Sequence, residues 1–331
     1  MTEQTYRVDV IGHQWAVELL TRQHNGGRMP QSLLLAGPLN VGKATLARHF
    51  AQLLNCTGDG KPCGVCRSCR KVVSGNHPDV RILDDEHETL KIDQVRDLQH
   101  ELSLSPVEGR CRVAVLCNFE RATAGAANAL LKTLEEPASQ VVIILTAPDP
   151  AGLLPTIVSR CQIVTLRPLP ADQVQAALQE KWGAPAAQAE LLASLSAGRL
   201  GWAVRALTDE SFLERRQARL DDLRDLLQMH RAERLAYAQQ LSRDVLALKE
   251  ALTLWLTIWR DVLLLRSGSR AAIVNHDWQD SLQLLASKGS VAQAGEIVLK
   301  LQQALLNLDR NVNPRLNLEV ALLRLPRYAE F

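Results

Sequence analysis

The spacing of apolar residues changes near residue 167. Before that point, short apolar runs of β type alternate with stretches of helical periodicity; the clearest runs are 33–36, 113–116 and 141–145. Such alternation predicts a parallel sheet with helices on both faces. After Pro168 and Pro170 the apolar positions keep helical spacing and no convincing strand remains. The predicted fold class is therefore α/β followed by all-α.

Prolines and chain length divide the sequence further. A chain of 331 residues is too long for one compact core. The segment Arg167-Pro168-Leu169-Pro170 is typical of a linker, because each proline disfavours helix in the residue before it. We expect an α/β domain over residues 1–166, a small helical domain over 167–208 with a break at Ala197-Gly198, and a second helical domain over 209–331.

Charge and hydropathy exclude some locations and partners. The chain has 38 basic and 36 acidic residues, so no strong overall field attracts it to nucleic acid or to an anionic membrane. Residues 1–6 do not form a basic segment followed by an apolar run, and no stretch approaches the roughly 18 apolar residues of a membrane span. We therefore expect a cytoplasmic protein without membrane partners.

A phosphate-binding loop is predicted at residues 37–45, which read Gly-Pro-Leu-Asn-Val-Gly-Lys-Ala-Thr between an apolar run and a helix-forming stretch. Glycines at its ends let the backbone fold around phosphates, and the lysine reaches the terminal phosphates. The candidate contacts are Gly37, Asn40, Gly42, Lys43, Ala44 and Thr45. Bound ATP or ADP is one interpretation, and a glycine turn without ligand is the other.

The residues that bind magnesium in such sites are missing. Ala44 stands where a Ser or Thr normally supplies a hydroxyl, and Thr45 lies about 100° away around the helix. The strand predicted at 113–116 runs into Cys117 and Asn118, whereas ATPases present acidic residues there. Glu120 could replace them only if the strand continued. We therefore do not expect Mg²⁺, or ATP hydrolysis by this chain alone.

Four of the seven cysteines form the strongest metal signal. Cys56, Cys63, Cys66 and Cys69 are separated by six, two and two residues, with glycines and a proline among them. Short turns of this kind can bring four thiolates to a tetrahedral zinc ion. A disulfide pair is the alternative, although a cytoplasmic compartment disfavours it. With four protein ligands, such a zinc module at 56–69 has a structural role.

Several motifs together resemble bacterial clamp-loader subunits of the AAA+ class. They are Asn-Ala-Leu-Leu-Lys-Thr-Leu-Glu-Glu-Pro at 128–137, Ser159-Arg160-Cys161, His77-Pro78-Asp79, and the segments 11–14, 92–96 and 313–319. The resemblance implies an AAA+ P-loop domain with a zinc-binding insertion, a small helical lid and a C-terminal helical collar. It also implies work in the bacterial replicase, with gamma/tau and delta subunits as partners, and with the sliding clamp and primed DNA at the level of the assembly.

Within this family the Ser-Arg-Cys motif places its arginine at the ATP of the adjacent subunit, so the resemblance implies that Arg160 acts in trans. Guanidinium suits this role because it is always charged and can contact two phosphate oxygens. The sensor arginine of the ATPase members aligns with Gly201, near which Arg199 could substitute, and Thr146 takes the first sensor position. The chief alternative is an active ATPase subunit of the gamma/tau type that uses Glu120 or Thr45. A weaker one is a nucleic-acid-binding module around the zinc segment.

Overall fold

The computed structural model describes residues 8–58, 62–84, 89–309 and 312–328. Residues 1–6, where no leader was expected, and residues 59–61 of the expected zinc module lie outside the described residues. The chain divides into two compact units. The first contains residues 1–169 and 199–201, and the second contains 170–198 and 202–331. The three-domain division at 166 and 208 stays a prediction.

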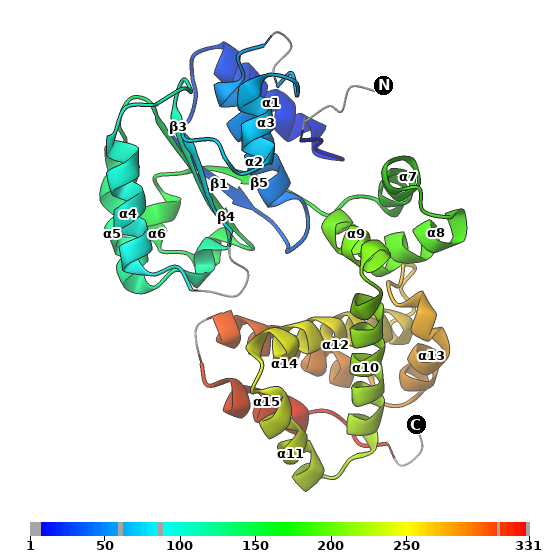
Figure 1. The fold of residues 1–331 in the computed structure, drawn as a ribbon. Helices are drawn as coiled ribbons and strands as arrows, with labels where there is room; N and C mark the ends of the chain where they lie inside the picture. Colours follow the sequence, from blue (N-terminus) through cyan, green and yellow to red (C-terminus); the bar gives the residue numbers. More distant parts are fainter. Residues whose placement is uncertain (1–7, 59–61, 85–88, 310–311, 329–331) are drawn as a thin grey trace. The chain divides into compact units, whose positions relative to one another are not determined.

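A five-stranded parallel sheet forms the centre of the first unit (Figure 1). Its order is β2-β3-β4-β1-β5, with all neighbouring strands parallel. The strands are β1 (Ser32–Ala36), β2 (Val80–Leu83), β3 (Arg112–Leu116), β4 (Val141–Ala147) and β5 (Gln162–Thr165). Since β4 lies between β1 and β3, the segments that follow these three strands meet at one edge of the sheet. This edge contains the phosphate loop.

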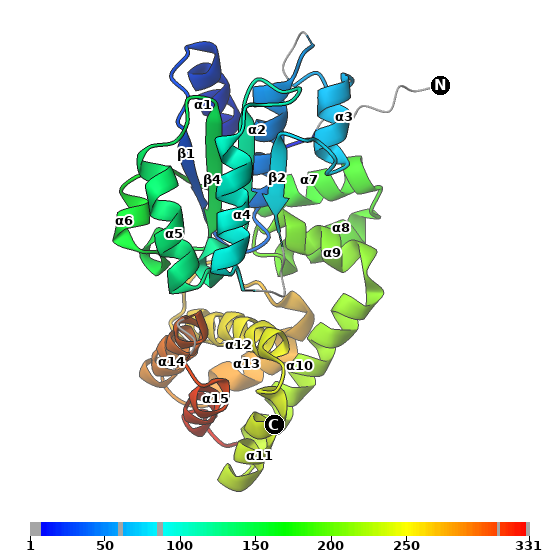
Figure 2. The same ribbon diagram turned by 60° about the vertical axis from the view of Figure 1, so that its left-hand side comes forward.

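Helices cover both faces of this sheet, as the sequence pattern predicts (Figure 2). One face lies against α1 (Gln14–Asn25), α2 (Lys43–Asn55) and α3 (Arg67–Val73). The other lies against α4 (Ile92–Ser103), α5 (Ala124–Glu135) and α6 (Pro155–Val158). Short 3₁₀ turns follow β3 (η1, Phe119–Arg121) and β4 (η2, Pro150–Gly152). The α/β part of the predicted fold class is confirmed.

The second unit is helical throughout its described residues. Its first three helices are α7 (Ala171–Trp182), α8 (Ala186–Leu195) and α9 (Leu200–Thr208). The remaining elements are α10 (Glu210–Gln228), α11 (Arg231–Leu241), α12 (Val245–Arg266), η3 (His276–Trp278), α13 (Gln279–Ser287), α14 (Val291–Asp309) and α15 (Pro314–Leu323). Among the described residues no helix is long and apolar enough to cross a membrane.

Proline and positive backbone angles set the boundaries between these helices. Residues 167–170 form no helix, and Pro170 caps α7. The expected break at Ala197-Gly198 is present, because φ is 49° at Ala197 and 78° at Gly198, a left-handed conformation that ends α8. Both sequence predictions are confirmed.

The core of the last helices is built around α12, which packs against α10, α13 and α14. Trp255 and Trp259 are fully buried there, and the Trp255 Nε1–H donates to the Arg219 carbonyl at 2.9 Å. These two tryptophans are therefore core residues of the helical bundle. The acidic side chain of Asp261 is also buried, and it accepts the backbone N–H groups of Val274 and Asn275 at 2.9 Å.

Candidate functional site: phosphate loop, exposed arginine and cysteine cluster

The phosphate loop connects β1 to α2 in the conformation that the glycine spacing predicts. Gly37 has φ 142° and lies so close to the Leu166 carbonyl that a Cβ atom would collide with it. Gly42 has φ 110° and caps α2, whose first residue is Lys43. Asn40 is also left-handed, with φ 63°. The loop therefore presents a helix N-terminus, the usual anion-binding end of a helix.

Lys43 turns back onto its own loop. Its Nζ donates to the carbonyls of Gly37 at 2.6 Å and Pro38 at 2.8 Å. Burial lowers the pKa of this ammonium to about 8, although the negative charge of Glu120 acts in the opposite direction. A phosphate group would have to displace the two carbonyls in order to reach Nζ. Ala44 and Thr45 follow in the first turn of α2, where Ala44 offers only a methyl group.

At the end of β3, where ATPases have metal-binding acids, the side chains and amides of this chain stabilise a turn. β3 ends at Leu116, and Asn118 adopts a left-handed φ of 53° that starts η1. The Asn118 N–H donates to the Thr146 hydroxyl at 3.0 Å. Burial, together with the charge of Asp84, raises the pKa of the Cys117 thiol to about 12, so this sulfur remains protonated at neutral pH. Thr146, the expected first sensor, thus supports the chain turn after β3.

Two acids do lie near this edge, outside the strand position. Glu120 sits in η1, and its charge acts on Lys43. The condition set for its substitution, a continued strand, is not met. Asp84 directly follows β2 and forms an ion pair with Arg48 of α2, with Nη2 and Oδ2 2.7 Å apart. The sequence analysis did not single out Asp84, because its role depends on β2 lying beside β3.

Gly201 makes close backbone contact with the phosphate loop. Its N–H donates to the Asn40 carbonyl at 2.9 Å, and a Cβ atom there would lie 2.9 Å from the same oxygen. An arginine at this position would require the loop to shift. Arg199, the proposed substitute, is partly buried, and burial lowers the pKa of its guanidinium.

Arg160 lies at the surface between α6 and β5. Its side chain is 32% exposed. Nη1 donates to the Thr156 carbonyl at 2.8 Å, and Nη2 forms an ion pair with Glu135 at the end of α5. The guanidinium is therefore held by neighbouring residues of the same unit while part of it remains accessible to solvent. A role in trans requires this accessibility.

The four expected metal ligands come together. The sulfur atoms of Cys56, Cys63, Cys66 and Cys69 all lie within 4.8 Å of one another. A tetrahedral zinc ion about 2.3 Å from each sulfur would space them ~3.8 Å apart. None of the seven cysteines forms a disulfide, which favours a metal site over the alternative of a disulfide pair. This cluster can hold a metal ion.

Backbone N–H groups donate to three of these sulfurs and so stabilise the thiolate form. Cys63 N–H donates to the Cys56 sulfur at 3.4 Å, Cys66 N–H to Cys63 at 3.3 Å and Cys69 N–H to Cys66 at 3.4 Å. Burial tends to raise the pKa of the Cys66 thiol, but donors from Cys69 and Thr57 outweigh it and bring the pKa to about 6. Gly58 is required nearby, since a Cβ atom would lie 2.8 Å from the Cys63 sulfur.

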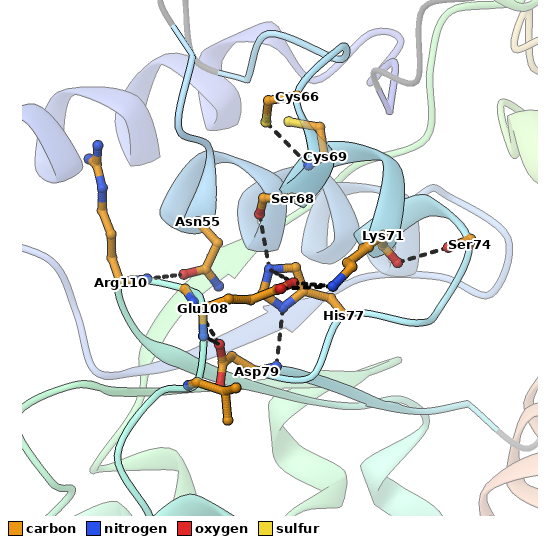
Figure 3. A network of polar contacts seen from close by, with 12 residues as sticks. Asn55, Cys66, Ser68, Cys69, Lys71, Ser74, His77, Asp79, Glu108 and Arg110 are labelled. Carbon is orange, nitrogen blue, oxygen red and sulfur yellow. Dashed lines mark hydrogen bonds and ion pairs between the residues drawn. The ribbon is translucent and has the colours of Figure 1, made fainter.

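A polar network fixes the helix that carries Cys69 to the α/β unit (Figure 3). The His77 ring accepts the Asp79 N–H at Nδ1 at 3.1 Å, so the neutral ring carries its proton at Nε2, which donates to the Ser68 hydroxyl at 3.0 Å. On the other side, Lys71 pairs with Glu108 at 2.7 Å. The contacts connect α3 with the loop before β3. Of these residues, the sequence analysis singled out only His77 and Asp79, as part of the His77-Pro78-Asp79 motif.

Comparison with known proteins gives these features a context. Sequence models described as "DNA polymerase III, delta subunit" and "DNA polymerase III, delta subunit, C terminal" match residues 12–170 and 210–327. DNA polymerase III subunit delta′ of Bacillus subtilis is 28% identical over 302 residues, which are 90% of this chain and 91% of that protein. The chain belongs to the delta-prime subunit family of DNA polymerase III.

The tau relatives match less of this delta-prime family member. The tau subunit of Escherichia coli is 36% identical over 178 residues, which cover 53% of this chain and 27% of that protein. A solved gamma subunit-related protein of DNA polymerase III from Thermotoga maritima is 18% identical, covers 93% of this chain and 97% of that chain, and has a TM-score of 0.38. The match to the delta-prime subunit covers 90% of this chain, whereas the match to tau covers 53%. The alternative of a gamma/tau-type subunit is not favoured.

Proposed function

We propose that this chain is a clamp-loader subunit of the DNA polymerase III holoenzyme that does not hydrolyse ATP itself and supplies Arg160 to the ATP of a neighbouring subunit. One observation carries the proposal. The chain presents a partly exposed arginine in an intact Ser-Arg-Cys motif, while Ala44, Cys117 and Asn118 deprive its own phosphate loop of magnesium ligands. An arginine supplied in trans raises hydrolysis rates by roughly 10³ to 10⁵.

The partners follow from the family. Relatives include tau subunits of DNA polymerase III, so a gamma/tau-type ATPase is proposed as the neighbour that receives Arg160. A delta-type subunit completes the loader, which acts on the sliding clamp and primed DNA in the cytoplasm. This chain contributes one catalytic group, Arg160, and occupies a fixed position in the assembly.

An apolar surface on the last two helices supports this place. Two exposed leucines lie seven residues apart on α14, and three exposed apolar residues lie on one face of α15. They are Leu299 (66% exposed), Leu306 (52%), Leu316 (59%), Val320 (60%) and Leu323 (42%). Grouped exposed apolar residues of this kind are typical of protein interfaces. We name these five residues the collar surface and propose that it packs against neighbouring loader subunits.

The cysteine cluster is proposed to hold one structural zinc ion. The four thiolates complete a tetrahedral shell and leave no open position for substrate. When bound, the ion supplies a rigid crosslink between the end of α2 and the start of α3. Cys56, Cys63, Cys66 and Cys69 would hold it, and the N–H donors described above would offset part of the negative charge of the sulfurs.

The phosphate loop is proposed to be a passive seat. ATP or ADP bound there would contact the amides at the start of α2 and Lys43 without magnesium. Displacement of Lys43 from Gly37 and Pro38 would be required first. Nucleotide binding by the isolated chain should accordingly be equally strong with and without added Mg²⁺.

The central experiment measures ATP turnover by the assembly reconstituted from this chain, a gamma-type ATPase and a delta-type subunit. Arg160→Ala should abolish turnover at the site that faces this chain, and total turnover should fall by the share of that site. Arg160→Lys should restore little, because a lysine cannot make the two-oxygen contact. Arg96→Ala, which removes an exposed arginine from α4, is the matched control. Unchanged turnover with Arg160→Ala would contradict the proposal.

Turnover by the isolated chain tests the rival interpretation, an active ATPase that uses Glu120 or Thr45. We expect no turnover above background. Turnover that disappears with Lys43→Ala would establish that the chain hydrolyses ATP. Strong, salt-sensitive DNA binding by the isolated chain would instead favour a nucleic-acid-binding module.

A further inference from the structure

The contacts of Arg160 lie within its own chain. Both terminal nitrogens of the guanidinium are engaged within the chain. Nη1 donates to the Thr156 carbonyl at 2.8 Å and lies 3.4 Å from the Ser159 hydroxyl, while Nη2 forms an ion pair with Glu135. The Nη1–Nη2 edge is the edge that binds two oxygens of a carboxylate or a phosphate at once. In this conformation the edge is already in use.

Glu135 resembles a phosphate in its chemistry. A carboxylate offers the same paired anionic oxygens to guanidinium as a phosphoryl group does. It also cancels the charge of Arg160 locally, which weakens attraction to an approaching anion. Glu135 and a nucleotide phosphate therefore compete for one edge of Arg160.

The position of Glu135 makes this competition reversible. It is the last residue of α5, and its side chain is 49% exposed, whereas that of Arg160 is 32% exposed. Ion pairs exposed to this extent are weak and are screened by salt. A phosphate group that is desolvated at a subunit interface can therefore replace the carboxylate.

We propose that Glu135 is a positioning residue that holds Arg160 in a retracted, charge-paired state and is exchanged for nucleotide phosphate when a neighbouring ATPase subunit docks. This inference rests on the proposed function of Arg160 and specifies its regulation. In the free chain the arginine is neutralised and kept from unrelated anions. In the assembly it engages only where a phosphate stands within reach.

Glu135→Gln tests the exchange in the reconstituted assembly. The amide keeps the shape of the side chain but loses its charge. We expect the concentration of this chain that gives half-maximal ATP turnover by the assembly to fall by about two- to fivefold at low salt, the size of a weak exposed ion pair. The advantage should shrink at high salt, where the parent pair is already screened. In an Arg160→Ala background, Glu135→Gln should change nothing.

Glu136→Gln is the matched control, since it removes an equal, exposed charge from the next residue. It should leave the half-maximal concentration unchanged. A purely structural role of Glu135 would lower the thermal stability of the chain, and its effect would depend neither on salt nor on Arg160. Circular dichroism of each variant verifies that the chain folds.

The outcomes separate the two proposals. If Glu135→Gln raises the half-maximal concentration or lowers maximal turnover, Glu135 supports the active conformation and the exchange is refuted. If Arg160→Ala lowers turnover but Glu135→Gln has no effect, the exchange is again refuted and the function of Arg160 stands. If Arg160→Ala itself has no effect, the proposed function fails.

Discussion

Asp79 is a buried carboxylate that organises the loop before β3. It accepts the N–H groups of Val107 at 2.7 Å, Glu108 at 2.9 Å and Gly109 at 2.7 Å. Burial alone would raise the pKa of this carboxyl, but the three amides and Arg112 outweigh it and hold the pKa below its usual range. Charged Asp79 therefore stabilises the folded chain.

Asp79→Asn should lower the free energy of unfolding by about 2 to 3 kcal/mol at neutral pH, because the amide cannot accept three N–H groups and turns a donor toward some of them. Because folding lowers the pKa of Asp79, the free energy of unfolding should decrease as the solution becomes acidic. The stabilisation is present above the unfolded pKa and is lost as pH falls through the folded pKa. Denaturant unfolding of both proteins between neutral pH and about pH 3 should show the two free energies converging.

Asp97→Asn, a change at an exposed position of α4, is the control for this series and should leave the free energy of unfolding within about 0.5 kcal/mol of the parent value. A constant difference between Asp79→Asn and the parent at every pH would contradict the assigned role of the Asp79 charge.

The spacing of residues in the sequence predicted sites whose members lie close together along the chain. The four cysteines and the loop from Gly37 to Lys43 adopt the expected arrangement. Residues whose partners come from distant segments were missed. Arg216 and Arg234 lie in a charge-rich segment, but both are buried. Arg216 pairs with Asp277, and Arg234 donates to the carbonyls of Leu322 and Leu325. No local pattern distinguishes such arginines from solvated ones.

Among the elements, the strands in the middle of the sheet were predictable and the edge strands were not. β1, β3 and β4 are buried along their whole length and read as continuous apolar runs. β2 and β5 have four residues each and contain exposed polar side chains, such as Arg81 and Thr165. Short, polar edge strands limit unwanted pairing with other chains. They also lack the apolar run by which a strand is predicted from sequence.

Helix α3 has seven residues and is the element that a metal ion in the cysteine cluster would stabilise most. So short a helix is unstable without tertiary support. Cys66 caps it and Cys69 lies in its first turn. We expect one equivalent of zinc per chain by elemental analysis. Cys66→Ser or a strong chelator should remove the metal, lower the free energy of unfolding by about 3 kcal/mol or more, and raise amide exchange over residues 62–76.

Cys111→Ser is the control for the metal site, because Cys111 lies outside the cluster. It should retain zinc and normal exchange in α3. Full retention of zinc in Cys66→Ser would show that this sulfur is not a ligand. Loss of zinc without faster exchange in α3 would show that the network around Ser68 and His77 suffices to hold the helix.

At the scale of the whole molecule, the two units carry different parts of the proposed function. The α/β unit contains Arg160, the phosphate loop and the cysteine cluster, while the helical unit contains the collar surface. The fold class of each was predictable, because binary patterning differs between a parallel sheet and a helical bundle. The collar surface was not predictable, since an exposed apolar stripe on a helix has the same spacing as a buried one.

The collar surface makes a prediction about assembly that is independent of catalysis. Leu316→Asp with Val320→Asp places two charges in the middle of the exposed apolar face of α15. Their burial at an interface would cost about 1 to 2 kcal/mol each, which weakens association by roughly five- to thirtyfold per residue. The isolated chain should unfold as the parent does, because both side chains are exposed. Gel filtration with the gamma-type and delta-type subunits should then show loss of this chain from the complex.

Leu284→Asp on α13, where the side chain is 41% exposed, is the matched control, and it should remain in the complex. The pair of variants distinguishes a specific face from a general effect of added charge. If both dissociate, charge alone disturbs the assembly. If the α15 variant stays bound, the subunits join through another face. If it dissociates as expected, ATP turnover by the remaining subunits should equal that of the assembly carrying Arg160→Ala. In both cases no guanidinium contacts the ATP phosphate of the neighbouring subunit.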